Sequence, residues 1–166
     1  RKGAAPGFDD AIAKCKAAGD KDTEVRAAYQ AGRSYAYNGD HRTAVARYQA
    51  AEAADPAHSY ADDAQLRTAE EWADLNDDAK VTAALEDLPR RFPAGDMRAE
   101  ALWRLGWRAY RKGDDAKAIS YWQQQIAAVP IDDNYWAEGQ PQYWIGRAEQ
   151  RRGHTDVALA SWEAAV

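Results

Sequence analysis

Residues 32–56 have the sequence GRSYAYNGDHRTAVARYQAAEAADP, and residues 106–130 have the sequence GWRAYRKGDDAKAISYWQQQIAAVP. Both segments share one spacing: Gly, six residues, Gly-Asp, three residues, Ala, three residues, an aromatic residue, seven residues and Pro. They lie 74 residues apart, and half of that distance, 37 residues, separates Pro56 from Pro93. A pattern that recurs at a fixed distance predicts stacked copies of one small structural unit.

Glycines within the expected helices indicate where paired helices come close. Gly32, Gly106 and Gly146 occupy the same repeat position, the last after a step of 40 residues. A glycine in a helix interior costs about 1 kcal/mol relative to alanine, so we expect the paired helix to approach closely there. We expect small residues of the paired helices to face these glycines: Ala44, Ala118 and Ala158.

The sequence also marks the helix ends. Gly39 and Gly113 are expected to end a first helix in the left-handed conformation, while Asp40 and Asp114 cap the next helix. Prolines, which cannot continue a helix, are expected to stop the second helices: Pro56, Pro93 and Pro130. The second repeat is degenerate, and its residues at the Gly, Gly and Ala positions are Ala69, Asn76 and Val81.

The predicted fold is all-α, with antiparallel helix pairs stacked in a right-handed superhelix of about nine helices. Residues 1–166 are interpreted as a single α-solenoid segment cut from a longer protein. A half repeat over 8–18 precedes four repeats over 22–56, 59–93, 97–130 and 140–166. The helix pairs are expected near 22–37 and 40–54, 59–75 and 77–91, 97–112 and 114–129, and 142–152 and 155–166.

The repeat pattern resembles the tetratricopeptide repeat, with its glycine, alanine, aromatic and proline positions. The resemblance covers most of the chain and implies an interaction or scaffolding module that binds protein or peptide partners. Composition agrees with a folded soluble protein, because 46% of residues are hydrophobic and 30% are charged. A net charge of −5 and a pI near 5.2 argue against a nucleic-acid partner. No apolar run approaches the ~18–20 residues of a membrane span.

No motif predicts catalysis, a metal site or a cofactor. The histidines His41, His58 and His154 have no metal-type spacing with one another or with the lone Cys15, and we expect surface or capping positions for them. Paired aspartates fall mostly at expected helix starts, where they cap amides: Asp9-Asp10, Asp62-Asp63, Asp77-Asp78, Asp114-Asp115 and Asp132-Asp133. These residues alone are therefore not expected to form an enzyme.

Aromatic and arginine side chains suggest a binding groove. Trp103 and Trp107 are four residues apart and share one helix face, which lines the concave side in tetratricopeptide-like pairs. Aromatic platforms with guanidinium groups could stack sugars or peptide side chains and hold carboxylates. The alternative is packing between repeats. The candidate residues are Tyr29, Arg33, Tyr37, Trp103, Trp107, Tyr110, Arg111, Tyr143, Arg147 and Arg151.

Two strings resemble a narrower family. Residues 99–114, AEALWRLGWRAYRKGD, and residues 143–148, YWIGRA, resemble the non-catalytic superhelical region of bacterial soluble lytic murein transglycosylases. That resemblance, good from Phe92 to Val166, implies a periplasmic scaffold that positions a catalytic domain absent here and contacts peptidoglycan fragments. The family's catalytic motifs do not occur in this chain. The alternative is a stand-alone bacterial envelope tetratricopeptide adaptor for protein assembly, which the stretch from Arg91 to Gly106 also resembles.

Overall fold

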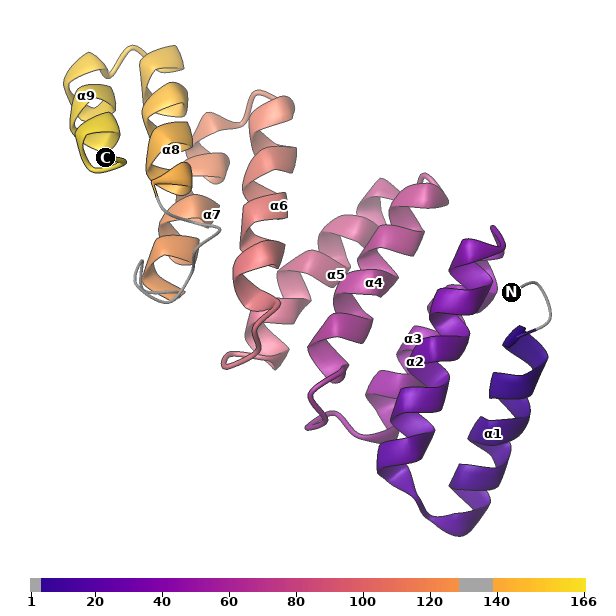
Figure 1. The fold of residues 1–166 in the computed structure, drawn as a ribbon. Coiled ribbons are helices and arrows are strands. Elements are labelled where there is room, and N and C mark those ends of the chain that lie inside the picture. The colour runs from indigo at the N-terminus through magenta and orange to yellow at the C-terminus, as the bar shows by residue number, and fades with distance from the viewer. Residues whose placement is uncertain (1–3, 129–138) are drawn as a thin grey trace. The chain divides into compact units, whose positions relative to one another are not determined.

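The computed structural model describes residues 4–128 and 139–166. Within these ranges all regular structure is helical, with nine helices and no strand (Figure 1). In chain order the helices are α1 (Ala4–Ala18), α2 (Lys21–Tyr37), α3 (His41–Ala54), α4 (Ala61–Asp74), α5 (Asp78–Arg91), α6 (Arg98–Arg111), α7 (Asp115–Ala128), α8 (Gln140–Arg151) and α9 (Thr155–Glu163). The predicted fold class, an all-α array of tetratricopeptide-like helix pairs, is confirmed.

The chain divides into two compact units, Arg1–Met97 with α1–α5 (unit 1) and Arg98–Val166 with α6–α9 (unit 2). Within each unit, every helix packs against the next helix of the chain. The pairs α4–α5, α6–α7 and α8–α9 lie within the predicted repeat ranges, α2–α3 begins one residue before its range, and α1 contains the half repeat but begins earlier. The single solenoid over residues 1–166 stays a prediction.

The turns inside the helix pairs have the predicted chemistry. Gly39 and Gly113 adopt φ values of 79° and 81°, and Asn76 takes the same left-handed region at 57° in the degenerate repeat. The Asp40 carboxylate accepts a hydrogen bond of 3.2 Å from the Thr43 amide. Asp77 and Asp114 cap α5 and α7 in the same way. A tight left-handed turn followed at once by a capped helix fixes each pair as an antiparallel hairpin.

The repeat glycines face aromatic rings and not the alanines that the sequence suggested. A methyl group added to Gly32 would lie 2.6 Å from the Tyr48 ring. At Gly106 and Gly146 it would meet the indoles of Trp122 and Trp162 even more closely. The expected partners Ala44, Ala118 and Ala158 are fully buried, but the ring four residues further along the same helix fills the space opposite the glycine.

Each unit has its own hydrophobic core. In unit 1 the buried residues include Val25, Ala28 and Tyr48, and in unit 2 they include Ile119 and Trp122. Pro56 and Pro93 follow the ends of α3 and α5, as predicted, while Pro130 lies outside the described residues. None of the described helices is both long and apolar enough to cross a membrane.

Candidate functional site

Aromatic side chains of α6 and α8 form a continuous cluster in unit 2, here called the aromatic cluster: Trp103, Trp107, Tyr110, Tyr143 and Trp144. Trp103 and Trp107, one helical turn apart, have ring centroids 5.7 Å apart. Trp107 joins the two helices, since its ring centroid lies 4.3 Å from that of Trp144. Tyr110 adds a second link, with its centroid 5.6 Å from that of Trp144. The first helices of two adjacent repeats thus contribute to one aromatic surface.

The aromatic cluster rests on the core of unit 2. Trp122 of α7 is fully buried, and Trp103 and Tyr110 each lie 5.8 Å from it between ring centroids. Trp103, Trp107, Tyr110 and Trp144 are all half-buried. The rings therefore pack on the core without being fully buried. A binding role for the rings stays a prediction.

Two arginines of α8 border the aromatic cluster, and they differ in their hydrogen-bond partners. The Arg151 guanidinium lies 3.9 Å from the centroid of Tyr110 and donates a hydrogen bond of 2.8 Å to Asp115. That hydrogen bond also raises the pKa of Arg151. Arg147 is exposed and donates a hydrogen bond of 3.1 Å to the Tyr143 hydroxyl, which raises the pKa of Arg147. Among the described residues Arg147 has no carboxylate partner. Its guanidinium also lies 5.9 Å from the centroid of the Trp144 ring.

The candidate residues of repeat 1 are not arranged in this way. Tyr29 is 7% exposed and packs against Tyr48 and Tyr60, with centroid distances of 5.6 Å and 5.0 Å. Tyr29 belongs to the core of unit 1, and its place in an exposed groove is corrected. Arg33 is exposed and lies 3.4 Å from the Gln30 side-chain oxygen. Tyr37 is 73% exposed. Arg111, at the end of α6, is also exposed.

The structure brings His41 to two carboxylates that the sequence did not connect with it. His41 Nδ1 lies 2.7 Å from Glu71 and 3.5 Å from Asp74, both on α4. The hydrogen bond to Glu71 raises the pKa of His41, while burial raises the pKa of Glu71. His58, expected at the surface or in a capping position, is largely buried, pairs with Asp22 at 3.0 Å and accepts a hydrogen bond of 3.0 Å from the Tyr60 amide. These contacts tie neighbouring elements of unit 1 together.

A second acidic group lies near the end of unit 1: Asp62, Asp63 and Asp96. Asp62 is buried, and its carboxylate accepts a hydrogen bond of 3.2 Å from the Met97 amide. Burial raises the pKa of Asp63 and of Asp96. As predicted for paired aspartates, Asp62 and Asp63 stand in the first turn of α4.

Sequence reasoning missed a recess in unit 1 between α3, α4 and α5, with a volume of about 480 Å³. Its position is signalled by two departures from the repeat. Ala84 stands where the first and third pairs have the large residues Arg47 and Tyr121 and the fourth has Ser161, and Thr68 stands where α2 and α6 have apolar residues. The alanine removes side-chain bulk from an inter-helix contact, and the threonine adds a hydroxyl at such a contact.

Comparison with known proteins supports the repeat fold. The family model of the tetratricopeptide repeat matches residues 100–130. No curated protein matches the chain. Among solved structures, a crystal structure of MamA has 19% identity and a TM-score of 0.59, over 97% of this chain and 89% of that one. MamA from Desulfovibrio magneticus RS-1 has 18% identity and a TM-score of 0.57, over 98% and 93% of the two chains.

A further similar structure is a kinesin light chain of Podosopora anserina with nearly identical TPR-like repeats. It has 16% identity and a TM-score of 0.62, over 98% of this chain and 83% of that one. At these identities the likenesses concern the fold. The chain has a tetratricopeptide-like repeat fold.

Proposed function

We propose that the chain is a helical-repeat scaffold that binds a protein partner through the aromatic cluster and Arg147 of unit 2. The observation that supports this most directly is the contact between Trp107 and Trp144, 4.3 Å apart between ring centroids. This contact joins first helices of adjacent repeats while both rings stay half-exposed. A rigid aromatic surface of this kind loses little conformational entropy when a partner covers it.

Trp, Tyr and Arg are the residues that most often dominate interface energies, at roughly 2 kcal/mol or more per hot spot. All three types occur within the aromatic cluster and its border. Because Trp103 and Trp107 also pack on Trp122, their orientation is fixed before a partner arrives. Preorganisation of this kind improves affinity by lowering the ordering cost of binding.

The charge at the edge of the aromatic cluster indicates the chemistry of the partner. Arg147 is exposed and has no carboxylate partner among the described residues. Arg151, in contrast, is already paired with Asp115. A partner segment that carries a carboxylate beside an apolar side chain would pair with Arg147 and cover Tyr143 and Trp144 together. Acidic peptides fit this description, and so do acidic peptidoglycan fragments.

Two narrower hypotheses rest on the sequence strings alone. One is a non-catalytic scaffold of a lytic transglycosylase in the bacterial periplasm, with peptidoglycan among its contacts. The other is a stand-alone adaptor of the bacterial envelope that assembles proteins. Neither role requires catalysis by these residues. Soluble muropeptides distinguish them: saturable binding that requires Arg147 favours the first hypothesis, and acidic peptides bound without muropeptides favour the second.

The proposal is tested with a phage-displayed library of random dodecapeptides selected on the wild-type chain. Selected peptides are expected to combine Asp or Glu with an apolar residue, and their binding should weaken as salt rises. Arg147→Glu is expected to lower their affinity at least about tenfold, because it turns a charge-assisted contact into a repulsion.

The matched control is Arg42→Glu, which changes another exposed arginine, on α3 of unit 1. Circular dichroism and Tm verify that both variants keep the fold. Binding that is equal in wild type, Arg147→Glu and Arg42→Glu would remove the aromatic cluster from consideration as the partner site.

A further inference from the structure

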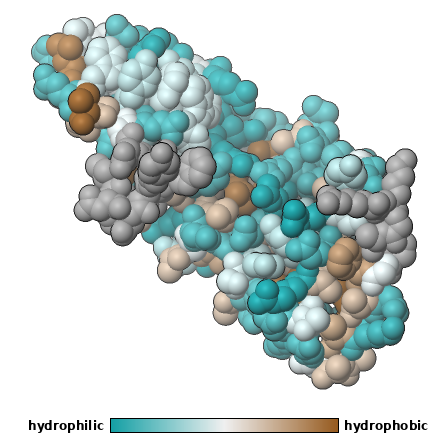
Figure 2. Space-filling model, viewed as in Figure 1, coloured by the Kyte–Doolittle hydropathy of each residue, from teal (hydrophilic) through white to brown (hydrophobic). Residues whose placement is uncertain are grey.

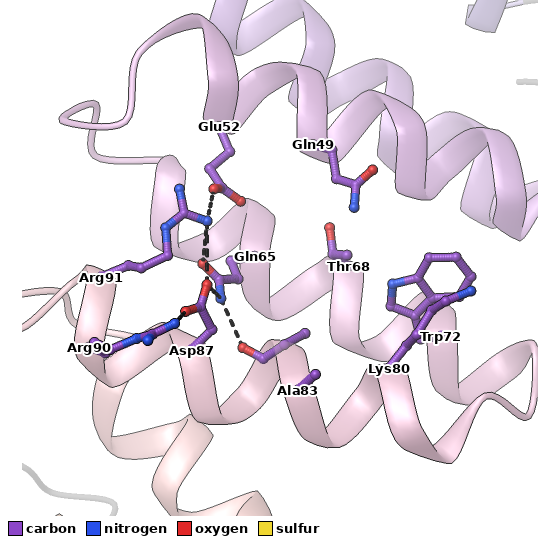
Figure 3. A pocket seen from close by; sticks show the side chains of 11 residues that line it. Gln49, Glu52, Gln65, Thr68, Trp72, Lys80, Ala83, Asp87, Arg90 and Arg91 are labelled. Atoms are coloured by element: carbon purple, nitrogen blue, oxygen red, sulfur yellow. Dashed lines mark hydrogen bonds and ion pairs between the residues drawn. The ribbon is translucent and has the colours of Figure 1, made fainter.

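A recess opens on unit 1 between α3, α4 and α5, and none of the residues that line it belongs to the aromatic cluster (Figure 3). We call it the α4 recess, because α4 forms its floor through Gln65, Thr68 and Trp72. Figure 3 shows Gln49 of α3 and Thr68 of α4 facing each other across the gap. With a volume of about 480 Å³, it falls in the range of ordinary ligand sites.

The preceding junction of the same unit shows why this space is open. Between α1, α2 and α3, Arg47 Nε donates to Asp9 at 2.6 Å and the Tyr35 hydroxyl donates to the other oxygen of Asp9 at 2.6 Å. One repeat later, 37 residues on, the positions of Asp9 and Arg47 hold Ala46 and Ala84. Alanine thus replaces two of the three side chains that meet in the first junction, while Trp72 stands at the position of Tyr35.

A buried hydroxyl points to a ligand in the α4 recess. Thr68 is 5% exposed, and its Oγ1 has no hydrogen-bond partner among the described residues. Native proteins rarely leave such a group unpaired, because the lost hydrogen bonds to water lower stability. The equivalent positions in the other repeats carry no polar side-chain atom: Ala31, Leu105 and Ile145. The hydroxyl is therefore specific to this recess and not a feature of the repeat.

The charged groups that line one end of the α4 recess are already paired. Glu52 forms an ion pair with Arg91, which also lies 3.6 Å from Asp87, and Asp87 pairs with Arg90. Burial raises the pKa of Glu52, so a second anion beside it would be unfavourable. A charged ligand at this end would have to break an existing pair.

The other end has an indole and a cation that is also paired. The Lys80 ammonium lies 3.9 Å from the centroid of the Trp72 ring and 3.0 Å from Asp77. The wall between the two ends consists of Ala83 and Ala84. What remains for a ligand is an apolar wall, the Thr68 hydroxyl and the exposed Gln49 amide, which has no hydrogen-bond partner among the described residues.

We propose that the α4 recess binds an extended, uncharged peptide segment of a protein partner. A backbone amide supplies a carbonyl acceptor and an N–H donor. These match the Thr68 hydroxyl and the Gln49 side-chain amide, each of which can both donate and accept a hydrogen bond. An uncharged side chain of the segment would lie against Ala83, Ala84 and Trp72. Because Gln49 of α3 and Lys80, Ala83 and Arg90 of α5 are exposed, the recess covers only one side of a ligand. That geometry suits a segment held on a larger partner and not an enclosed small molecule.

The test introduces the Asp–Arg pair of the junction between α1, α2 and α3 at the equivalent positions beside the α4 recess. The double variant Ala46→Asp, Ala84→Arg places Asp and Arg at the positions of Asp9 and Arg47, beside Trp72 in place of Tyr35. A phage-displayed library of random heptapeptides is selected on wild type and counter-selected on this variant. The selected peptides are expected to be uncharged and to lose at least about tenfold in affinity for the double variant. Arg42→Glu, at an exposed position of α3 that does not line the recess, should leave their affinity unchanged.

A second variant keeps the test valid if the double variant does not fold. Thr68→Val keeps the shape of the side chain and removes only the unpaired hydroxyl, so the fold should persist. Loss of one neutral hydrogen bond is expected to weaken the selected peptides about three- to tenfold. Thr82→Val on α5 is the matched control, because its hydroxyl already donates to the Asp78 carbonyl at 3.0 Å. Ala46→Asp alone controls for the added charge.

The proposal is overturned if selection yields no peptide that distinguishes wild type from the folded double variant. It is equally overturned if the selected peptides bind Thr68→Val and wild type with the same affinity. Peptides that are charged, and whose binding weakens steeply with salt, would also contradict it, because they would identify an ion-pairing site. Uncharged peptides that respond to Thr68→Val and to the double variant, but not to Thr82→Val, would support it.

Discussion

Tyr29 and Trp103 occupy the same repeat position, 74 residues apart, yet the two units use them differently. In unit 1, Tyr60 covers Tyr29, which is 7% exposed and belongs to the core. In unit 2, Trp103 packs on Trp122 but stays half-buried, at one end of the aromatic cluster. Unit 1 therefore buries its first-helix aromatic residue in the core, whereas under the proposed function unit 2 would present its own to a partner. Repeat position alone does not decide between the two roles.

The ionic contacts that connect one helix pair to the next also differ between the two units. His41 on α3 lies 3.5 Å from Asp74 on α4, and the residues at the matching positions in unit 2 are Asp115 and Arg151. These form an ion pair between α7 and α8. The signs of the two partners are exchanged, and only the pair in unit 1 contains a group that titrates near neutral pH. The connection between pairs should depend on pH in unit 1 and not in unit 2.

Substitution of the repeat glycines should reveal the difference in size between the rings that face them, Trp122 in unit 2 and Tyr48 in unit 1. Gly106→Leu is expected to lower the free energy of unfolding by about 3 kcal/mol, because the new side chain would collide with the indole of Trp122. Gly32→Leu should cost less, since the Tyr48 ring leaves slightly more space. Urea denaturation of both variants measures the two values.

The control for these variants is Gly7→Ala in α1, where an added methyl group meets no atom within 4 Å. Alanine is the better helix former, so Gly7→Ala should be neutral or slightly stabilising. An unfolding midpoint for Gly106→Leu that equals that of wild type would contradict the close contact between α6 and α7.

Sequence periodicity predicted most of the fold because each repeat signal acts locally. The turn at Gly39, the cap at Asp40 and the stop at Pro56 depend on neighbouring residues only, so spacing is sufficient to place them. The close contact at Gly106 was also predictable, because a helix-interior glycine has a cost that packing must offset. Its partner was misassigned: the ring of Trp122, and not Ala118, fills the space.

The candidate site was less predictable because exposure depends on contacts between repeats. Nothing in the spacing of Tyr29 indicated that Tyr60 would cover it. The pairing of His41 with Glu71, 30 residues away, likewise has no sequence signature. The open α4 recess was detectable in principle, because Ala84 departs from Arg47 and Tyr121 at the same position. Departures from a repeat can be more informative about function than its matches.

The pH dependence of the two connections can be measured directly. Because its pKa is raised in the folded state, His41 stabilises unit 1 fully below its unfolded pKa near 6.5, and this contribution is lost as pH rises through the folded value. Burial also raises the pKa of Glu71 in the folded state, so the contribution of Glu71 to the free energy of unfolding likewise falls as pH rises. We expect the free energy of unfolding to fall by about 1 kcal/mol between pH 6 and 8.

Variants of His41 isolate this contribution from those of the other histidines. His41→Gln should remove the pH-dependent part, whereas His41→Arg should give a permanent pair like that of Asp115 and Arg151. Hydrogen exchange at pH 6 and pH 8 locates the effect, which should appear in α3 and α4 and not in α7 and α8. An equal pH dependence in wild type and His41→Gln would contradict the assignment.

The smallest expected effect concerns the hydroxyl of Thr68, and its sign distinguishes the two units further. The position holds Leu105 and Ile145 in unit 2, and Ala31 and Thr68 in unit 1; Thr68 Oγ1 is buried without a partner among the described residues. Thr68→Val should therefore raise the free energy of unfolding by about 0.5–1 kcal/mol, because it removes an unpaired polar group while keeping the volume. The same substitution at Thr82, whose hydroxyl donates to Asp78, should be neutral or slightly destabilising. A loss of stability in Thr68→Val would mean that the hydroxyl has a partner within the protein. A gain, together with weaker peptide binding, would mean that unit 1 gives up stability at this position to bind a partner.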